Sequence, residues 1–232
     1  MLKLDDFAFW NPSPTGFADR ADAGRRLARR LEALHLENPL VLALPRGGVE
    51  VGFEIAEALH APLDVVPARK LGAPWQPELA IGAIAPGAVA LNEHIIAQLG
   101  LSRQDIDRVI AEEEREMERR AEAFRAGLPP LDVAGKTVIL VDDGLATGAT
   151  AAAAIKSIRR GNPRRLVFAV PVGARESVAA LSKEVDELIC LETPAEFRAV
   201  GEWYQDFAQT SDRRVIELLR RAAALRPVSE AP

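Results

Sequence analysis

Cysteine and histidine are scarce in this chain. Its one cysteine, Cys190, cannot form a disulfide within the chain. Cys190 stands in the apolar run "ELICLE", so we expect it to be buried as a small hydrophobic side chain rather than reactive. The three histidines lie far apart, without the spacing of metal ligands. These absences argue against a disulfide framework and against a dedicated zinc site.

Long apolar runs and an excess of positive charge are also missing. No window approaches the roughly 18 uninterrupted apolar residues that a membrane-spanning helix needs. The first residues, "MLKLDDFAFW", are acidic and contain no apolar stretch of signal-peptide length. The formal net charge is −5, which does not predict a broad nucleic-acid-binding surface. We therefore expect a cytoplasmic protein that binds neither membranes nor nucleic acid.

Three common catalytic motifs are absent as well. The sequence has no G-x-x-x-x-G-K-[ST], which argues against a kinase or nucleotide hydrolase built on a P-loop. No G-x-G-x-x-G follows an expected strand, so a nicotinamide-dependent Rossmann enzyme is not predicted. A serine hydrolase is disfavoured because there is no G-x-S-x-G.

What the chain does contain is an alternation of short apolar runs with segments of helical periodicity. The expected strands are residues 39–45, 62–68, 137–141, 165–172 and 187–192. The expected helices are residues 19–34, 49–60, 149–160 and 175–184. Because the strands are continuously apolar, they are typical of a parallel sheet that is covered on both faces. We predict an α/β fold with a parallel twisted sheet flanked by helices.

A region of different composition interrupts this alternation. "RKLGAPWQPELAIGAIAPG" is rich in proline and glycine and is expected to form a loop with short strands. "SRQDIDRVIAEEEREMERRAEAF" carries an apolar stripe, typical of an amphipathic helix that packs on the core or on a partner subunit. We expect an N-terminal loop and helix at 1–36, a core at 37–210 with a hood and helical insertion at about 70–127, and a C-terminal helix and tail at 211–232.

The stretch "VILVDDGLATGAT" places two adjacent carboxylates, Asp142 and Asp143, at the end of an apolar strand. They repel each other unless hydroxyl donors or cations engage them, and the vicinal hydroxyls of a sugar are suitable donors. The small residues that follow offer backbone N–H groups, two threonine hydroxyls and a helix start, which together bind a phosphate monoester. The pattern predicts a ribose 5-phosphate site. The structural alternative is an ordinary turn followed by an ordinary helix cap.

This stretch resembles the phosphoribosyl-pyrophosphate motif of type I phosphoribosyltransferases. The resemblance implies that Asp142 and Asp143 bind the ribose 2- and 3-hydroxyls, act in catalysis and hold Mg²⁺. It also implies transfer of a 5-phosphoribosyl group from phosphoribosyl pyrophosphate (PRPP) to a nitrogen acceptor such as a purine-like base, with release of pyrophosphate. The loop expected to bind the 5-phosphate consists of Ala146, Thr147, Gly148, Ala149 and Thr150.

A second loop, "LPRGG" after the first expected strand, resembles the pyrophosphate loop of the same family. The resemblance implies that Arg46 meets the diphosphate oxygens and is a catalytic residue, with the amides of Gly47 and Gly48 alongside. Family members often hold a non-proline cis peptide at the position of the Pro45–Arg46 bond. A tight turn with a surface arginine is the alternative. Both loops follow strands, and ligands of open α/β sheets bind beyond the carboxyl ends of the strands.

"VVPARKLGAPWQPELAIG" is similar to the second strand and mobile hood loop of adenine-type members. The resemblance implies that Arg69 and Lys70 contact pyrophosphate and reach toward a neighbouring subunit, so we expect a homodimer. A closing loop at 71–78 would exclude water from the reaction. Glu78 on this loop is either a catalytic proton-transfer residue or a solvated carboxylate.

"TPAEFRAVGEWYQDF" resembles the purine-facing segment of hypoxanthine-guanine members. The resemblance implies that Phe197 stacks on a base and binds the substrate, and that Asp206 lies near the metal. Neighbouring aromatic residues form either the base pocket or a hydrophobic plug: Trp203, Tyr204 and Phe207.

Two functional interpretations stay open. One is an Mg²⁺-dependent phosphoribosyltransferase, a pentosyltransferase of the glycosyltransferase class in nucleotide metabolism. The other is a non-catalytic sensor or regulatory protein that binds PRPP or a nucleotide. The intact "RGG" and the loop acid Glu78 favour the enzyme. The sequence does not identify the acceptor.

Overall fold

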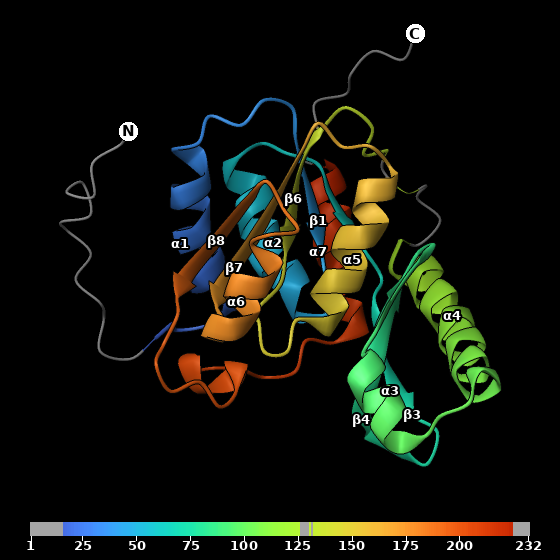
Figure 1. Cartoon of the computed structure of the whole chain (residues 1–232). Helices are drawn as coiled ribbons and strands as arrows, with labels where there is room; N and C mark the ends of the chain where they lie inside the picture. Colours follow the sequence, from blue (N-terminus) through green and yellow to red (C-terminus); the bar gives the residue numbers. More distant parts are fainter. Residues whose placement is uncertain (1–15, 126–129, 131, 225–232) are drawn as a thin grey trace, which may run out of the picture.

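A five-stranded parallel sheet forms the centre of the computed structural model, which describes residues 16–125, 130 and 132–224 (Figure 1). The strand order is β2-β1-β6-β7-β8, and every neighbouring pair is parallel. The strands are β1 (Pro39–Ala43), β2 (Leu63–Val65), β6 (Thr137–Val141), β7 (Arg165–Val172) and β8 (Glu187–Glu192). This confirms the predicted α/β fold with a parallel sheet flanked by helices.

Helices cover both faces of this sheet. One face is covered by α1 (Arg20–Glu32), α2 (Gly47–Ala58) and α7 (Asp212–Ala224), and the other by α5 (Ala149–Arg160) and α6 (Arg175–Leu181). Consecutive residues of each strand point to opposite faces, so both faces are apolar: Val41 and Ile139 enter the first core, Leu40 and Leu140 the second. This two-sided burial explains why the strands read as continuous apolar runs. The edge strand β8 is less covered, and Cys190 on it is only partly buried.

The region expected to be a loop with short strands is a second, antiparallel sheet, which we call the hood sheet (lower right in Figure 1). It contains β3 (Arg69–Ala73), β4 (Gln76–Ala85) and β5 (Ala88–Leu91), and β4 is ten residues long. The expected closing loop at 71–78 is therefore wrong: most of it belongs to paired strands, and Leu71 is fully buried. Only the β3–β4 turn, with Trp75 63% exposed, is loop-like.

Glycine and proline in this region lie at an irregularity in the β3–β4 pairing rather than in a loop. The β3–β4 register shifts on both sides of Gly72. A Cβ atom built at Gly72 would lie 2.4 Å from the carbonyl oxygen of Pro77. Only glycine permits this close approach of the two strands. The composition that predicted a loop with short strands is thus the composition of an irregular pair of longer strands.

Two helices follow the hood sheet, α3 (Glu93–Leu99) and α4 (Arg103–Arg125). Met117 of α4 packs with the buried residues of the hood sheet, whereas Phe124, two turns later, packs in the main core. Arg125 then forms an ion pair with Asp64 of β2 at 3.1 Å. The apolar stripe of α4 therefore joins the hood sheet to the core of the same chain.

Two expectations concern the ends of the chain and membranes. Residues 1–15 and 225–232, which belong to the expected N-terminal and C-terminal segments, lie outside the described residues. Over the part of the chain that the structure covers, no helix has both the length and the apolar character of a membrane span.

Candidate functional site

The "RGG" loop and the loop after Asp142 and Asp143 meet at the carboxyl ends of two central strands of the sheet. Strands β1 and β6 are neighbours in register, with Ala43 opposite Val141, so their carboxyl ends lie side by side. The chain crosses from β1 to β2 on one side and reaches β6 on the other, which makes this edge the topological switch point of the sheet. Such crevices are where open α/β sheets bind ligands.

Asp142 carries an unfavourable charge at this edge. Burial, followed by the neighbouring charge of Asp143, raises the pKa of Asp142 well above its usual range. Its Oδ1 atom accepts a hydrogen bond from the backbone N–H of Asp143 at 2.9 Å. A carboxylate in this state gains from hydroxyl donors or a cation, which agrees with the role expected for it.

Asp143 has a protein partner that the sequence did not predict. Arg20 of α1 donates from Nε to Asp143 Oδ2 at 2.7 Å and from Nη1 to the carbonyl oxygen of Ala208 at 2.7 Å. Arg20 is only 7% exposed, and its guanidinium lies 3.9 Å from the ring centroid of Phe207. The Tyr204 hydroxyl donates to the Asp143 carbonyl oxygen at 2.5 Å. Asp143 is thus held in place by its neighbours, with Oδ2 occupied by Arg20.

The "RGG" loop lies directly against the acid pair. The Pro45–Arg46 peptide bond is cis, as the resemblance implied. A Cβ atom built at Gly47 would stand 1.8 Å from Asp143 Oδ2, and one at Gly48 would stand 2.8 Å from the carbonyl oxygen of Val141. Side chains at these two positions would therefore push the loop away from the acids. Glycine is required here by space rather than by backbone conformation.

Arg46 immediately precedes α2 and is directed toward α7. Its Nη1 atom lies 3.4 Å from Asp212 Oδ1, at the start of α7, and its side chain is 32% exposed. The segment just before α7 is also held to α2, because the Thr210 hydroxyl donates to Glu50 Oε1 at 2.6 Å. The 3.4 Å ion pair is long, so Arg46 is weakly held and able to turn to an anion.

The expected phosphate loop surrounds the start of α5. Ala146 and Thr147 are exposed, Gly148 has a positive φ of 77° and caps the helix, and Ala149 and Thr150 form its first turn. Within the described chain no side chain caps this helix, and its first turn contains no acidic residue. Its first N–H groups are therefore available to an anion, which the helix dipole also favours.

An open cleft of about 490 Å³ borders the phosphate loop. Residues 147–149 line it together with Asn92 and Glu93 next to the hood sheet and Ser177 of α6. The Ser177 hydroxyl donates to the carbonyl oxygen of Ala146 at 2.5 Å and so fixes the loop from this side. A ligand held by the phosphate loop would therefore reach solvent.

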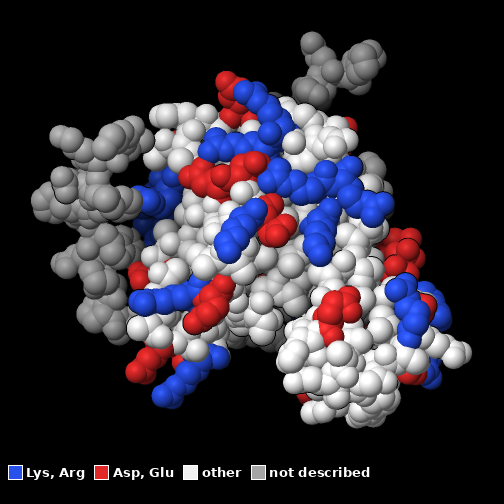
Figure 2. Space-filling model, in the orientation of Figure 1, with Lys and Arg blue, Asp and Glu red and all other residues white. Residues whose placement is uncertain are grey.

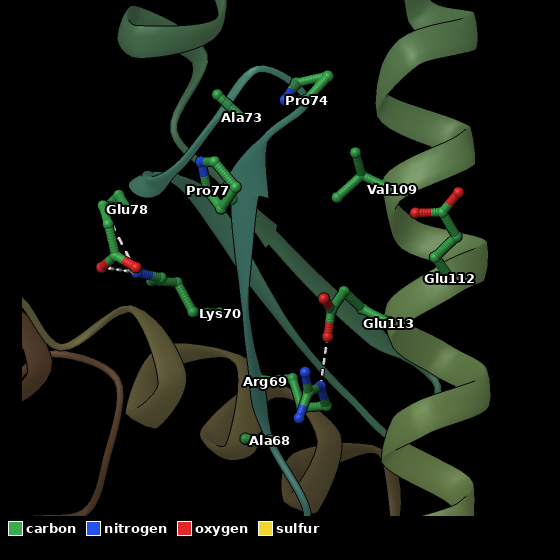
Figure 3. A pocket seen from close by; sticks show the side chains of 11 residues that line it. Ala68, Arg69, Lys70, Ala73, Pro74, Pro77, Glu78, Val109, Glu112 and Glu113 are labelled. Carbon is green, nitrogen blue, oxygen red and sulfur yellow. Dashed lines mark hydrogen bonds and ion pairs between the residues drawn. The ribbon is translucent and has the colours of Figure 1, made fainter.

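The other expected hood residues line a different cleft, of about 420 Å³, between the hood sheet and α4 (Figure 3). Glu78 is 96% exposed there, and Lys70 Nζ lies 3.5 Å from its Oε2 atom. Neither acid of the pair lines this cleft. The structure therefore does not bring Glu78 or Lys70 together with Asp142 and Asp143, and for Glu78 it favours the solvated carboxylate.

Arg69 differs from Lys70 in its surroundings. It lines a second, small cavity of about 40 Å³ together with Pro45 and Arg46 of the "RGG" loop. Its Nε atom donates to Glu113 of α4. The structure thus brings Arg69 beside Arg46 within one chain, without a second subunit.

The aromatic segment near residue 200 forms a plug. Phe197 is partly buried and packs against a separate apolar cluster that contains Phe17 and Tyr204. Val200, in the short 3₁₀ helix Val200–Trp203, lies so close to Gly144 that a Cβ atom there would be 2.3 Å from its Cγ1 atom. The segment covers the turn after Asp143, and the stacking role of Phe197 stays a prediction.

Asp206 is likewise not placed as a metal ligand. Its Oδ1 atom accepts a hydrogen bond from the Ala208 N–H at 2.9 Å, within its own loop. Among the described residues no group of three or more potential metal-binding side chains exists. Asp142 and Asp143 alone still fit Mg²⁺, because this ion is commonly bound by one or two carboxylates together with the phosphates of a substrate.

Comparison with known proteins agrees with this arrangement. A parallel sheet with an acid pair, a phosphate loop and an "RGG" loop at its switch point defines a phosphoribosyltransferase-like protein. Residues 70–206 match the family model described as "Phosphoribosyl transferase domain". The chain belongs to this family.

Two curated relatives from Mycobacterium tuberculosis, strains CDC 1551 / Oshkosh and ATCC 25618 / H37Rv, are each named "Putative phosphoribosyl transferase". Each is 48% identical to this chain over 207 residues, which is 89% of the chain and 47% of the relative. The chain thus spans about half the length of these relatives.

Solved structures show the same fold. The protein TT1426 from Thermus thermophilus superimposes with a TM-score of 0.76 at 40% identity, over 89% of this chain and 98% of that one. A hypothetical protein from Neisseria gonorrhoeae, solved with bound ppGpp, has a TM-score of 0.50 at 12% identity, over 87% and 92% of the two chains. The second similarity concerns the fold alone.

Proposed function

We propose that this chain transfers a 5-phosphoribosyl group from PRPP to a nitrogen acceptor and releases pyrophosphate. The observation that carries the proposal is the contact between the two loops: Gly47 leaves no room for a Cβ atom beside the Asp143 carboxylate. The sites expected for the sugar and for the diphosphate are therefore adjacent, as a single PRPP molecule requires.

Each end of PRPP has a matching group in the chain. The 5-phosphate would accept hydrogen bonds from the uncapped N–H groups at the start of α5. Asp142 would accept hydrogen bonds from the ribose hydroxyls, which relieves the repulsion that raises its pKa. Arg46, which precedes Gly47 in the chain and is weakly held by Asp212, would bind the diphosphate.

The chemistry then needs little more than positioning and charge stabilisation. The C1–O bond to the diphosphate breaks with its electron pair going to the leaving group, and a nitrogen lone pair of the acceptor forms the C1–N bond. The acceptor proton is released to solvent. Arg46 stabilises the negative charge that develops on the diphosphate. An Mg²⁺ ion held by Asp142 and Asp143 would supply further neutralisation of the diphosphate charge.

A PRPP-consumption assay tests the proposal. Purines, pyrimidines and simple amines are offered with PRPP and Mg²⁺, and released pyrophosphate is measured. We expect release with at least one acceptor, and at least a tenfold loss of PRPP affinity in Asp142→Asn, measured by titration calorimetry. Asp107→Asn is the matched control, because Asp107 lies on the exposed side of α4 and pairs with Arg103 of the same helix.

The outcomes separate the two functional interpretations. PRPP binding that depends on Asp142, with no pyrophosphate released for any acceptor, would identify a sensor instead of an enzyme. PRPP binding that is unchanged in Asp142→Asn would reject the site itself. The nucleotide panel for the sensor includes ppGpp, because a protein of the same fold was solved with it.

A further inference from the structure

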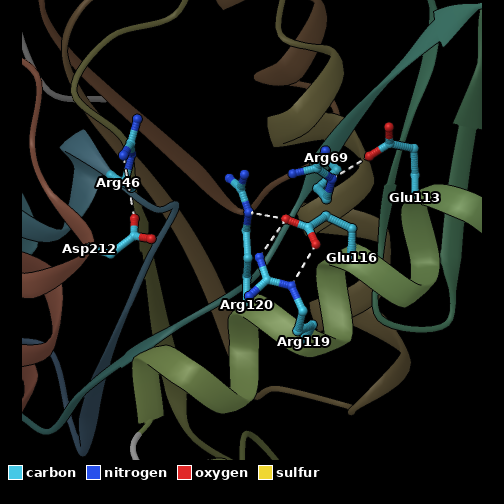
Figure 4. Close-up of polar contacts among 7 residues, drawn as sticks. All are labelled: Arg46, Arg69, Glu113, Glu116, Arg119, Arg120 and Asp212. Atoms are coloured by element: carbon cyan, nitrogen blue, oxygen red, sulfur yellow. Dashed lines mark hydrogen bonds and ion pairs between the residues drawn. The ribbon is translucent and has the colours of Figure 1, made fainter.

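The helix α4 brings an arginine to the "RGG" loop that no sequence motif indicated. Arg120 lines the same 40 Å³ cavity as Arg46 and Arg69, together with Pro45. These residues come from three separate segments: the loop before α2, the start of β3, and α4. In Figure 4 the Arg120 side chain extends into the space between Arg46 and Arg69.

Carboxylates hold these arginines in a way that leaves their outer nitrogens exposed to a ligand. Arg120 donates from Nε to Glu116 Oε1 at 2.7 Å, and Arg69 donates from Nε to Glu113. In neither residue do the two terminal nitrogens hydrogen bond to any part of the chain that the structure describes. A guanidinium fixed through Nε presents its other N–H groups as a fork, which suits phosphate oxygens.

Each of the three arginines that line the cavity is paired with one carboxylate, and Arg119, which lies outside the cavity, adds a fourth positive charge nearby. The seven side chains in Figure 4 are four arginines and three carboxylates. Hydrogen bonds from Arg119 and Arg120 lower the pKa of Glu116 to about 2, so this carboxylate stays ionised and the arginines still outnumber the acids. The terminal nitrogens that these ion pairs leave unbonded on Arg69 and Arg120, with the positive charge of Arg119 close by, favour a bound anion.

We propose that Arg120 is a third arginine of the diphosphate site, so that α4 takes part in binding the leaving group. The cavity between the arginines, about 40 Å³, has room for little more than a water molecule. The anion would therefore lie at its rim, against Arg46, where the outer nitrogens of Arg69 and Arg120 reach it. The inference rests on the proposed function, and it assigns to the insertion a role in recognition besides packing.

Arg119 provides a matched control for the test. It precedes Arg120 on the same helix and donates to the same carboxylate, at 2.7 and 2.9 Å to the two Glu116 oxygens, but it does not line the cavity. The full chain carrying Arg120→Gln or Arg119→Gln is titrated with inorganic pyrophosphate and Mg²⁺ in a calorimeter. We expect about a tenfold or greater loss of pyrophosphate affinity for Arg120→Gln and less than about a threefold change for Arg119→Gln.

Arg46→Gln separates the two proposals. If Arg46→Gln weakens pyrophosphate binding and Arg120→Gln does not, the role of Arg120 is refuted while the proposed function stands. If neither variant changes the affinity, the diphosphate site itself is misplaced. Circular dichroism and melting curves of all three variants check that they fold. Arg120→Lys, which keeps the charge but loses the fork, should recover part of the affinity if the role is correct.

Discussion

Asp142 and Asp143 are adjacent in the chain but have different surroundings. Asp143 is paired with Arg20, whose side chain is 8% exposed, whereas Asp142 forms no such ion pair within the described residues. Burial and the charge of Asp143 raise the pKa of Asp142. The two residues therefore affect stability in opposite directions, although both serve the same proposed site.

The first prediction compares Asp142→Asn with Asp143→Asn. Removing the charge of Asp142 relieves repulsion, so Asp142→Asn should increase the free energy of unfolding by about 1–2 kcal/mol at pH 8. Asp143→Asn leaves Arg20 buried without its counter-charge, so it should decrease that free energy by about 2 kcal/mol. Urea unfolding without Mg²⁺ measures both.

The pH dependence of this effect has a definite sign. An acid whose pKa is raised by folding favours the folded state most when it is protonated. Its contribution is complete below the ordinary carboxyl pKa and is lost as the pH rises through the raised value. The gain from Asp142→Asn should therefore be larger at pH 8 than at pH 5. Equal gains at the two pH values would show that folding does not raise the pKa of Asp142 well above its ordinary range.

At the scale of helices and strands, local pattern predicted most of the central sheet. Both faces of β1 and β6 are covered, so nearly every residue of these strands is apolar. A continuous apolar run of this length is therefore a clear signal for a buried strand. The hood sheet was predicted as a loop with short strands, and the ten-residue β4 was missed, because the Gly72 and Pro77 of a bulged strand pair resemble loop composition. Of the candidate site, the sequence predicted the residues of the two loop motifs, "LPRGG" and "VDDGLATGAT". Arg20 was missed because its contact with Asp143 spans 123 residues.

Helix α4 gives the second prediction. Its apolar stripe predicted a helix, but not that Met117 and Phe124 enter different cores. Phe124 is 2% exposed in the main core, so Phe124→Ala should lower the free energy of unfolding by about 3–5 kcal/mol. Val109→Ala, at a partly buried position of the same helix, should cost about 1 kcal/mol or less. Chemical denaturation compares them, and equal losses would mean that α4 does not anchor the hood sheet to the core.

For the whole molecule, the proposed site joins the hood sheet to the core. The small cavity is lined by the "RGG" loop of the core, the start of β3 and α4. Figure 2 shows acidic and basic side chains interleaved over the core, with the hood sheet largely uncharged, so neither sign dominates this face. Because Arg69 lies beside Arg46 of its own chain, the diphosphate site needs no second copy, and the homodimer stays a prediction.

A ligand that contacts both parts should stabilise the molecule as a unit. PRPP with Mg²⁺ at about a hundred times its Kd should raise the free energy of unfolding by about 2.7 kcal/mol. For a chain of this size that corresponds to an increase in Tm of roughly 5–10 °C, measurable by differential scanning fluorimetry. Ribose 5-phosphate, which lacks the diphosphate, should give a smaller increase at the same concentration. An equal increase for both sugars would place the binding energy at the phosphate loop alone and leave the arginines of the hood and α4 without a ligand.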